Sequence, residues 1–170
     1  MRAVLVFFLL FGLSSISQAQ RAQRAADFSA VSIKGEKVEL VSLRGKVVLL
    51  TFWSSRCPIC QSEIPKLNRL ASSYRASNVV FLAATPENED IVLSYLRQQP
   101  FDFQILPDSF GLMLKYAERD SEGRVNIAYP AYYVIDRSGY VQLRDSGWDK
   151  AGRLSSAIER LLLQSDPQAR

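Results

Sequence analysis

Residues 46–60 read KVVLLTFWSSRCPIC, an apolar and β-branched run that ends at a pair of cysteines. The continuous apolar part, 46–53, predicts a strand that is buried on both faces of a sheet. Residues 58–74 then carry apolar side chains near helical spacing, and 79–84 predicts a second buried strand. A strand, a helix and a strand in this order predict a right-handed parallel unit.

The segments on either side extend this unit into an α/β fold, a central mixed sheet with helices on both faces. Upstream, 28–33 and 37–40 predict an N-terminal hairpin around Lys34-Gly35. Downstream, the expected elements are a helix at 89–98, a strand at 101–105, a helix from a cap at Asp108 to Tyr116, a charged loop at 115–128, a hairpin of 131–135 with 140–144, and a last helix capped by Asp149.

Composition excludes several classes of function. The chain has 170 residues, of which 48% are hydrophobic and 22% charged, which is typical of one folded domain. It has no histidine, which excludes Ser-His-Asp and Cys-His catalysis. Two cysteines are too few for a four-ligand zinc site, and we expect no metal. The net charge of +4 comes from scattered basic residues, so nucleic acid is not an expected partner.

The N-terminus has the order of a secretory signal. One charge at Arg2 precedes an apolar run at 3–13 and small or polar residues at 14–19. We predict a signal peptide at 1–19, a polar lead-in at 20–26, one domain at 27–163 and a polar tail at 164–170. The apolar run is short for a bilayer, so an uncleaved anchor is the less favoured alternative. The expected location is periplasmic or otherwise extracytoplasmic, where disulfides persist.

The cysteine pair at 57 and 60 is suited to thiol chemistry. Residues three apart in a helical turn bring their Cα atoms within disulfide range. Cys57 is expected at the helix N-terminus, where free N–H groups and the helix dipole favour a thiolate, and the neighbouring cation of Arg56 favours it further. Pro58 suits the first helical turn. We therefore expect Cys57 to attack a partner disulfide and the deeper Cys60 to resolve the mixed disulfide.

Three other roles are compatible with a pair of cysteines. A purely structural disulfide would close a very short loop and constrain the unfolded chain by only about 2 kcal/mol. Half of a zinc site shared between two chains lacks further ligands in the sequence. Two inert buried thiols would be unusual at an exposed helix start. Export, spacing and helix position together favour a redox-active pair.

Three segments resemble one known family. They are similar to the TlpA/ResA-like exported thiol–disulfide oxidoreductases, which have a redoxin or AhpC/TSA-type domain. The segments are residues 52–60, the continuation Cys60-Gln61-Ser62-Glu63-Ile64-Pro65, and Tyr129-Pro130 with the hairpin that follows. The segment from Phe28 to Val47 matches as well. The resemblance covers 27–163 and implies a thioredoxin-like fold with an added N-terminal β-hairpin.

The resemblance also implies roles for single residues. Pro130 would be a cis-proline that faces the cysteines, and Tyr129 before it would offer backbone groups to an extended partner segment. Pro65 would kink the active-site helix. Glu63 would take part in proton transfer to or from Cys60, although an exposed glutamate with no role is the alternative.

Some positions depart from the family pattern. Thr51 stands where thioredoxins carry a buried aspartate, and Arg56 replaces the usual aromatic residue before the first cysteine. The segment 116–129 is longer and more charged than the family pattern, and we expect it to be a solvated loop without contacts. We expect the aromatic side chains of Trp53 and Tyr129 to be exposed around the cysteines and to contact a client together with Pro58 and Pro130. Tyr132 and Tyr133 are expected in the core.

These observations predict an exported enzyme that exchanges thiols and disulfides with proteins. The resemblance favours a reductant, as in cytochrome c maturation or general extracytoplasmic thiol reduction. Expected partners are a client protein and an upstream thiol electron donor, with no cofactor beyond the Cys57–Cys60 pair and a monomeric state. A peroxiredoxin-like peroxidase is an alternative, but it requires proline and threonine where Leu50 and Ser54 stand. A non-catalytic binding module of the same fold is the third hypothesis.

Overall fold

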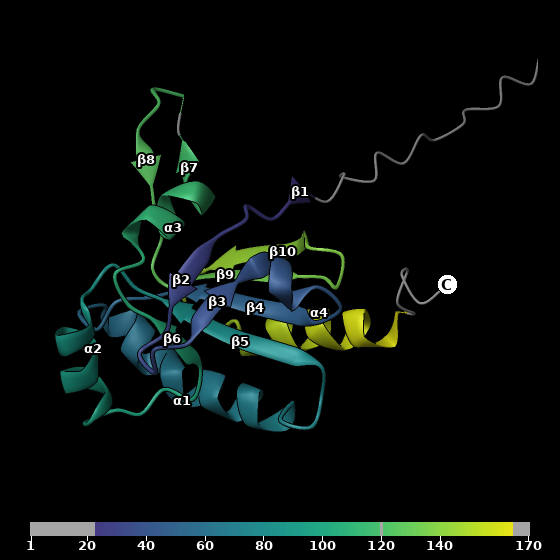
Figure 1. Cartoon of the computed structure of the whole chain (residues 1–170), viewed down its shortest axis with the longest axis horizontal. Coiled ribbons are helices and arrows are strands. Elements are labelled where there is room, and N and C mark those ends of the chain that lie inside the picture. Colours follow the sequence, from purple (N-terminus) through teal and green to yellow (C-terminus); the bar gives the residue numbers. More distant parts are fainter. Residues whose placement is uncertain (1–22, 120, 165–170) are drawn as a thin grey trace, which may run out of the picture.

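The computed structural model describes residues 23–119 and 121–164 (Figure 1). Its centre is a six-stranded mixed sheet with the strand order β1-β10-β9-β4-β5-β6. Three strands are parallel: β4 (Val47–Phe52), β5 (Val79–Ala84) and β6 (Gln104–Leu106). The others are antiparallel to their neighbours: β9 (Ala131–Ile135), β10 (Tyr140–Ser146) and β1 (Gln23–Arg24). The predicted fold class is confirmed.

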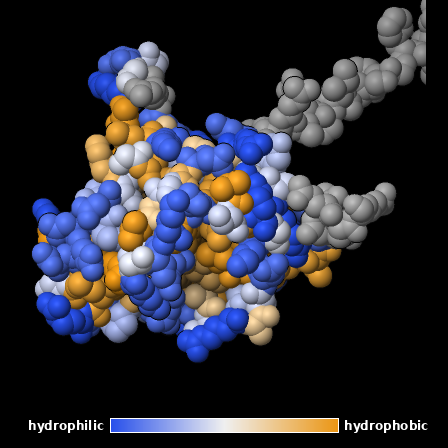
Figure 2. All heavy atoms as spheres, viewed as in Figure 1, coloured by the Kyte–Doolittle hydropathy of each residue, from blue (hydrophilic) through white to orange (hydrophobic). Residues whose placement is uncertain are grey.

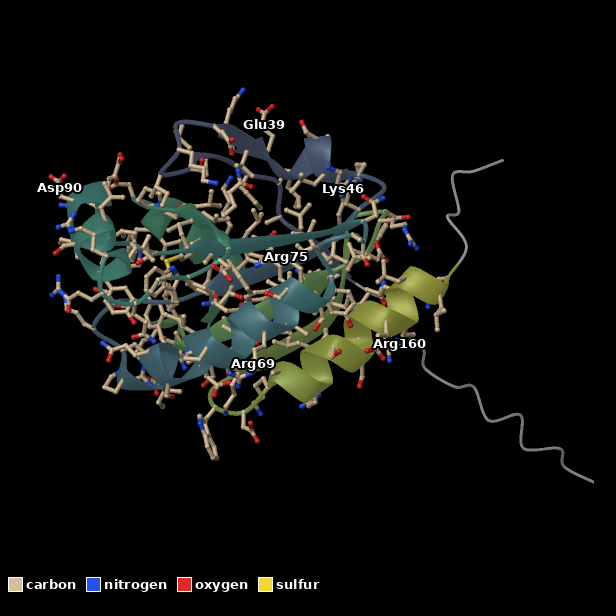
Figure 3. All side chains as sticks on the ribbon, turned by 90° about the horizontal axis from the view of Figure 1, so that it is seen from below. Glu39, Lys46, Arg69, Arg75, Asp90 and Arg160 are labelled. Carbon is tan, nitrogen blue, oxygen red and sulfur yellow. The ribbon has the colours of Figure 1, made fainter. Side chains whose placement is uncertain are left out.

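The central strand β4 is buried along its whole length because both faces of the sheet are covered. On one face lie α1 (Pro58–Ser73), α2 (Glu89–Leu96) and α4 (Ala151–Leu163), with Leu49, Val134 and Ile158 in their common core. Figure 3 shows α1 and α4 side by side over the sheet. This face is called the α1/α4 face below.

The opposite face is covered by shorter elements. These are the hairpin of β2 (Ser29–Val31) and β3 (Lys37–Glu39), the 3-10 helix η1 (Leu40–Leu43) and α3 (Phe110–Tyr116). Phe28, Leu50 and Met113 share their core. The predicted N-terminal hairpin is therefore confirmed, and helices lie on both faces.

Several predicted boundaries were wrong. The strand expected at 101–105 is β6 at Gln104–Leu106, because Phe101 and Phe103 fill the core before the ladder begins. Neither aspartate caps its predicted helix: Asp108 and Asp149 have positive φ angles of 50° and 59°, and the helices begin at Phe110 and Ala151.

The segment predicted as a loop at 115–128 is also partly ordered into strands. It contains the antiparallel pair β7 (Glu118–Arg119) and β8 (Val125–Asn126), which projects from the body (Figure 1). Arg144 on β10 contacts its base, since Nη1 lies 2.8 Å from Glu118 Oε1. The tip is hydrophilic in Figure 2. Strands of two residues are too short to show an alternation that a sequence pattern could detect.

Two further observations concern the ends of the domain. Gln23–Arg24, within the predicted polar lead-in, form β1 on the edge strand β10, for which the sequence carried no signal. Within 23–119 and 121–164, no helix is long and apolar enough to cross a bilayer. The predicted signal peptide at 1–19 lies outside the described residues.

Candidate active site

Cys57 is the N-cap residue of α1, directly after the carboxyl end of β4 and its short loop. Its Sγ accepts a hydrogen bond of 3.1 Å from the backbone N–H of Cys60, one of the N–H groups that a helix start leaves without a helical partner. Pro58 is the first helical residue, where its missing N–H costs nothing. Both cysteines are free thiols, and Cys57 is half-buried whereas Cys60 is buried. The predicted placement of the pair is confirmed.

Cys60 is 2% exposed and belongs to the core of the α1/α4 face. Burial raises the pKa of its thiol far above the ordinary value, and its hydrogen bond with Cys57 raises it further. At neutral pH, Cys60 is therefore a protonated thiol behind a reachable Cys57. The two sulfurs therefore differ in reactivity, because only a thiolate attacks a disulfide.

Glu87 holds the loop that precedes Cys57, a role that the sequence analysis missed. Its carboxylate is 8% exposed and accepts hydrogen bonds from Ser54 Oγ at 2.8 Å, Ser55 N at 2.9 Å and Ser55 Oγ at 3.0 Å. Arg56 Nε lies 3.8 Å from Glu87 Oε1, so the cation expected to act on Cys57 is partly matched by this carboxylate. One sequence signal could have indicated this role. Glu87 follows the predicted buried strand at 79–84, which neighbours the strand that leads to Cys57, and side chains after neighbouring parallel strands meet at one edge of the sheet.

The Tyr129–Pro130 peptide bond is cis, as the resemblance implied. Among the described residues, neither backbone group of Tyr129 has a hydrogen-bond partner. Tyr129 and Cys57 border the same open cleft of about 700 Å³, and Arg56, Glu87 and Asp108 complete its charged wall. Burial raises the pKa of Tyr129, and the nearby groups Cys60 and Glu87 add to the shift. An extended chain in this cleft would meet the free backbone of Tyr129 beside Cys57.

The prediction that Trp53 is exposed at the site is wrong. Its side chain is 1% exposed, and its ring packs 5.5 Å from the rings of Tyr95 and Phe101. Trp53 follows β4 and its side chain lies in the same core as Leu49 and Cys60. Its ring therefore packs inside the protein and offers no surface to a client. Pro130 is buried too, whereas Pro58 is exposed next to Cys57.

Glu63 is fully buried, so the exposure expected in the alternative interpretation is wrong. Lys66 Nζ donates to its Oε1 at 2.9 Å, and the backbone N–H of Lys150 donates to its Oε2 at 3.4 Å. Lys66 also reaches Asp149 at 2.9 Å, which joins α1 to the start of α4. The Glu63 and Lys66 charges are paired, which is the usual condition for burying a carboxylate.

In the part of the chain that the structure describes, no group of three or more Cys, Asp or Glu side chains is arranged to hold a metal ion. The chemistry that the site can perform is that of its two sulfurs. A reachable thiol on a helix start, backed by a protonated thiol and faced by a cis-proline loop with free backbone groups, can form a mixed disulfide and then resolve it. On this fold, that chemistry defines a thioredoxin-like thiol–disulfide oxidoreductase.

Comparison with known proteins places the chain in a family. A model of the AhpC/TSA family matches residues 22–144, and the chain belongs to that family. It is 32% identical to the thiol-disulfide oxidoreductase ResA of Bacillus anthracis over 144 residues, which cover 84% of this chain and 79% of that protein. It is 30% identical to the soluble secreted antigen MPT53 of Mycobacterium tuberculosis over 130 residues, 76% of this chain and 70% of the relative.

Solved structures agree with this assignment. A candidate thiol:disulfide interchange protein DsbE from Chlorobium tepidum is 26% identical and superposes with a TM-score of 0.70 over 83% of this chain and 96% of its own. Within its family, this protein is thus similar to the ResA-type oxidoreductases, and it is a thiol–disulfide oxidoreductase.

Proposed function

We propose that the protein is an extracytoplasmic reductant of protein disulfides, with Cys57 as the nucleophile and Cys60 as the resolving thiol. The single observation that carries the division of roles is the contrast between the half-buried Cys57 on the helix start and the buried Cys60 one turn further on. The name of the ResA relative supports exchange with disulfides.

The reductant direction rests on the resemblance of residues 52–65, and of Tyr129-Pro130 with the hairpin that follows, to the TlpA/ResA-like oxidoreductases. We therefore expect a reduction potential nearer to about −270 mV than to about −120 mV.

The reaction follows from the two thiols. The Cys57 thiolate attacks one sulfur of a client disulfide, and the other client sulfur leaves as a thiolate and is protonated. Cys60 then loses its proton and attacks Cys57 Sγ, which releases the second client sulfur. The pair ends as a disulfide, and an upstream dithiol donor returns two electrons to it. No cofactor beyond the pair is needed, and one monomer contains all of these groups.

Client binding is proposed along the cleft between Cys57 and Tyr129. The free N–H and C=O of Tyr129 suit an extended peptide that adds a short strand pairing next to the sulfur. This places a client cysteine near Cys57 without demanding a particular side chain, which suits an enzyme that acts on unfolded or flexible segments of proteins. Cytochrome c precursors and other exported thiol proteins are clients of this kind.

Export is part of the proposal. The order of charged, apolar and small residues at 1–19 is typical of a secretory signal. The MPT53 relative is named a soluble secreted antigen, in agreement with such a location. We infer that the mature chain begins at Gln20 and works outside the cytosol.

The test is capture of the client on the exported Cys60→Ser variant. Without the resolving thiol, a mixed disulfide through Cys57 should accumulate, and mass spectrometry of the reduced complex identifies the client. The Cys57→Ser variant is the matched control and should capture nothing. If both variants capture the same proteins, the bond does not pass through Cys57. A measured potential near −120 mV would contradict the reductant direction.

A further inference from the structure

Two buried hydroxyls on the α1/α4 face have no partner. Thr51 on β4 and Tyr132 on β9 are paired directly across the sheet, and both are 0% exposed. Neither Thr51 Oγ1 nor the Tyr132 hydroxyl has a hydrogen-bond partner among the described residues. Native proteins rarely leave such groups unsatisfied, and an internal water is a common solution where the site is polar.

The same face carries Cys60, which must lose a proton in the proposed reaction, and a buried carboxylate, Glu63. Cys60 and Tyr132 belong to one core cluster, and Glu63 lies one turn further along α1 than Cys60. Glu63 is fully buried, yet its hydrogen bonds go to Lys66 and to the backbone of Lys150, and none joins it to Cys60. A proton that leaves Cys60 for Glu63 therefore requires an intermediary.

The Tyr132 hydroxyl lies within electrostatic reach of both groups. Burial raises the pKa of Tyr132, and Glu63 contributes to this shift more than Cys60 and Cys57 do. A phenol that keeps its proton is both a donor and an acceptor. It can therefore give a proton on one side while it receives one on the other.

We propose that the Tyr132 hydroxyl relays the proton of the resolving thiol, and that together with Thr51 it holds an internal water that connects the Cys60 thiol to the Glu63 carboxylate. The inference rests on the proposed function, since it concerns how the resolving thiol is activated. A water within hydrogen-bond distance of both hydroxyls would satisfy them, and water-mediated hydrogen bonds are nearly as favourable as direct ones.

The step balances as follows. As Cys60 Sγ attacks Cys57 Sγ of the mixed disulfide, its S–H proton passes to the bridging water and the Tyr132 hydroxyl, and a proton from their other side reaches Glu63. The Cys57–client S–S bond breaks, and the client sulfur leaves with the electron pair. Glu63 afterwards returns the proton to solvent at the rim formed by Lys66 and Asp149, where Asp149 is 65% exposed.

The charges around Glu63 come from three elements. Lys66 on α1 and the Lys150 backbone face it directly, and Lys66 also pairs with Asp149. Asp145 on β10 is paired with the ammonium of Lys150 at 3.3 Å. These pairs remain in a Tyr132→Phe variant. A change in the pH dependence of its resolution rate is therefore due to the loss of the Tyr132 hydroxyl.

The experiment uses the aromatic disulfide DTNB in stopped flow with the full mature chain. The first release of thionitrobenzoate reports attack by Cys57, and the second reports resolution by Cys60. Tyr132→Phe should slow the second phase about tenfold at neutral pH and leave the first phase unchanged. This factor is smaller than the full rate enhancement that a positioned proton-transfer group contributes. The second-phase rate of this variant should also rise with pH over a higher range than that of the wild type. Thr51→Val should show a smaller change in the same direction.

Tyr133→Phe is the matched control, because this neighbouring buried hydroxyl points to the opposite face and donates to the Tyr116 carbonyl. It should leave both phases unchanged. If Tyr132 acts through Glu63, adding Tyr132→Phe to Glu63→Gln should slow resolution no further. Equal second phases in the wild type and Tyr132→Phe, or additive losses in the double variant, overturn the inference. A wild type with no second phase overturns the proposed function instead.

Discussion

The carbonyl oxygen of Gln61 accepts a 2.7 Å hydrogen bond from Gln99 Nε2, which comes from the chain just beyond α2. In an uninterrupted helix this carbonyl would accept from the N–H of residue 65, but residue 65 is a proline inside α1 and has no N–H. Tyr95 fixes the amide orientation by donating to Gln99 Oε1 at 2.7 Å. The active-site helix is thus completed by a side chain 38 residues away.

This relationship predicts coupling between Pro65 and Gln99. Gln99→Ala should lower the free energy of unfolding by about 1 kcal/mol, because it leaves the Gln61 carbonyl without its donor. In a Pro65→Ala background the helix supplies the N–H, so the same substitution should cost much less. Urea unfolding of the wild type, the two single variants and the double variant measures the coupling, and additive losses would show that the two residues act independently.

Glu87 predicts an effect on the cysteine loop. Glu87→Ala removes both accepting oxygens, so the hydrogen bonds from Ser54 and Ser55 are lost. We expect a loss of about 1–3 kcal/mol of stability and slower reaction of Cys57 with DTNB. Glu89→Ala, on an exposed residue of α2, is the control and should leave the rate of Cys57 unchanged and the stability nearly so. Retained stability in Glu87→Ala would contradict the assigned role.

The two thiols should differ in alkylation. At about pH 8, iodoacetamide should modify Cys57 at least about tenfold faster than Cys60, because Cys60 is buried and its pKa is raised. Peptide mass spectrometry after timed quenching measures both rates. In urea the difference should largely vanish, which shows that it comes from the fold. Similar rates in the folded protein would exclude the assigned roles.

Stability should fall at alkaline pH. The pKa values of Cys60, Tyr116 and Tyr132 are raised in the folded state, chiefly by burial. The folded protein therefore keeps protons that the unfolded chain releases above the ordinary values of about 8.5 for a thiol and about 10 for a phenol. The stabilisation is complete below those values and is lost as the pH rises through them toward the folded values.

Urea unfolding between about pH 8 and pH 11 measures this slope, and Tyr132→Phe should make it shallower. Replacing the more exposed Tyr140 by phenylalanine is the control and should leave the slope unchanged. A flat pH profile of the wild type would contradict the assigned burial of these groups.

Local patterns predicted much of the fold, because they record which faces are buried. The apolar runs of β4 and β5 and the helical spacing of α1 were sufficient to place the Cys57–Cys60 pair at a strand-to-helix junction. The polar pair β7 and β8 could not be recognised in this way, since two-residue strands have no period. Helix starts at 108 and 149 were misplaced because both aspartates adopt positive φ angles.

The sequence by itself determined the class of chemistry: two cysteines three apart after a buried strand, before a proline that suits a helix start, with no histidine to support another mechanism. Only the tertiary structure decided how the groups around the pair are placed. Trp53 is inside and not at the surface, Glu87 holds the loop before Cys57, and the hydroxyls of Thr51 and Tyr132 are buried without a hydrogen-bond partner among the described residues. The physical reason is that helix and strand patterns follow from neighbours in sequence, whereas the burial and partners of a polar side chain depend on residues brought together by the packing of distant elements.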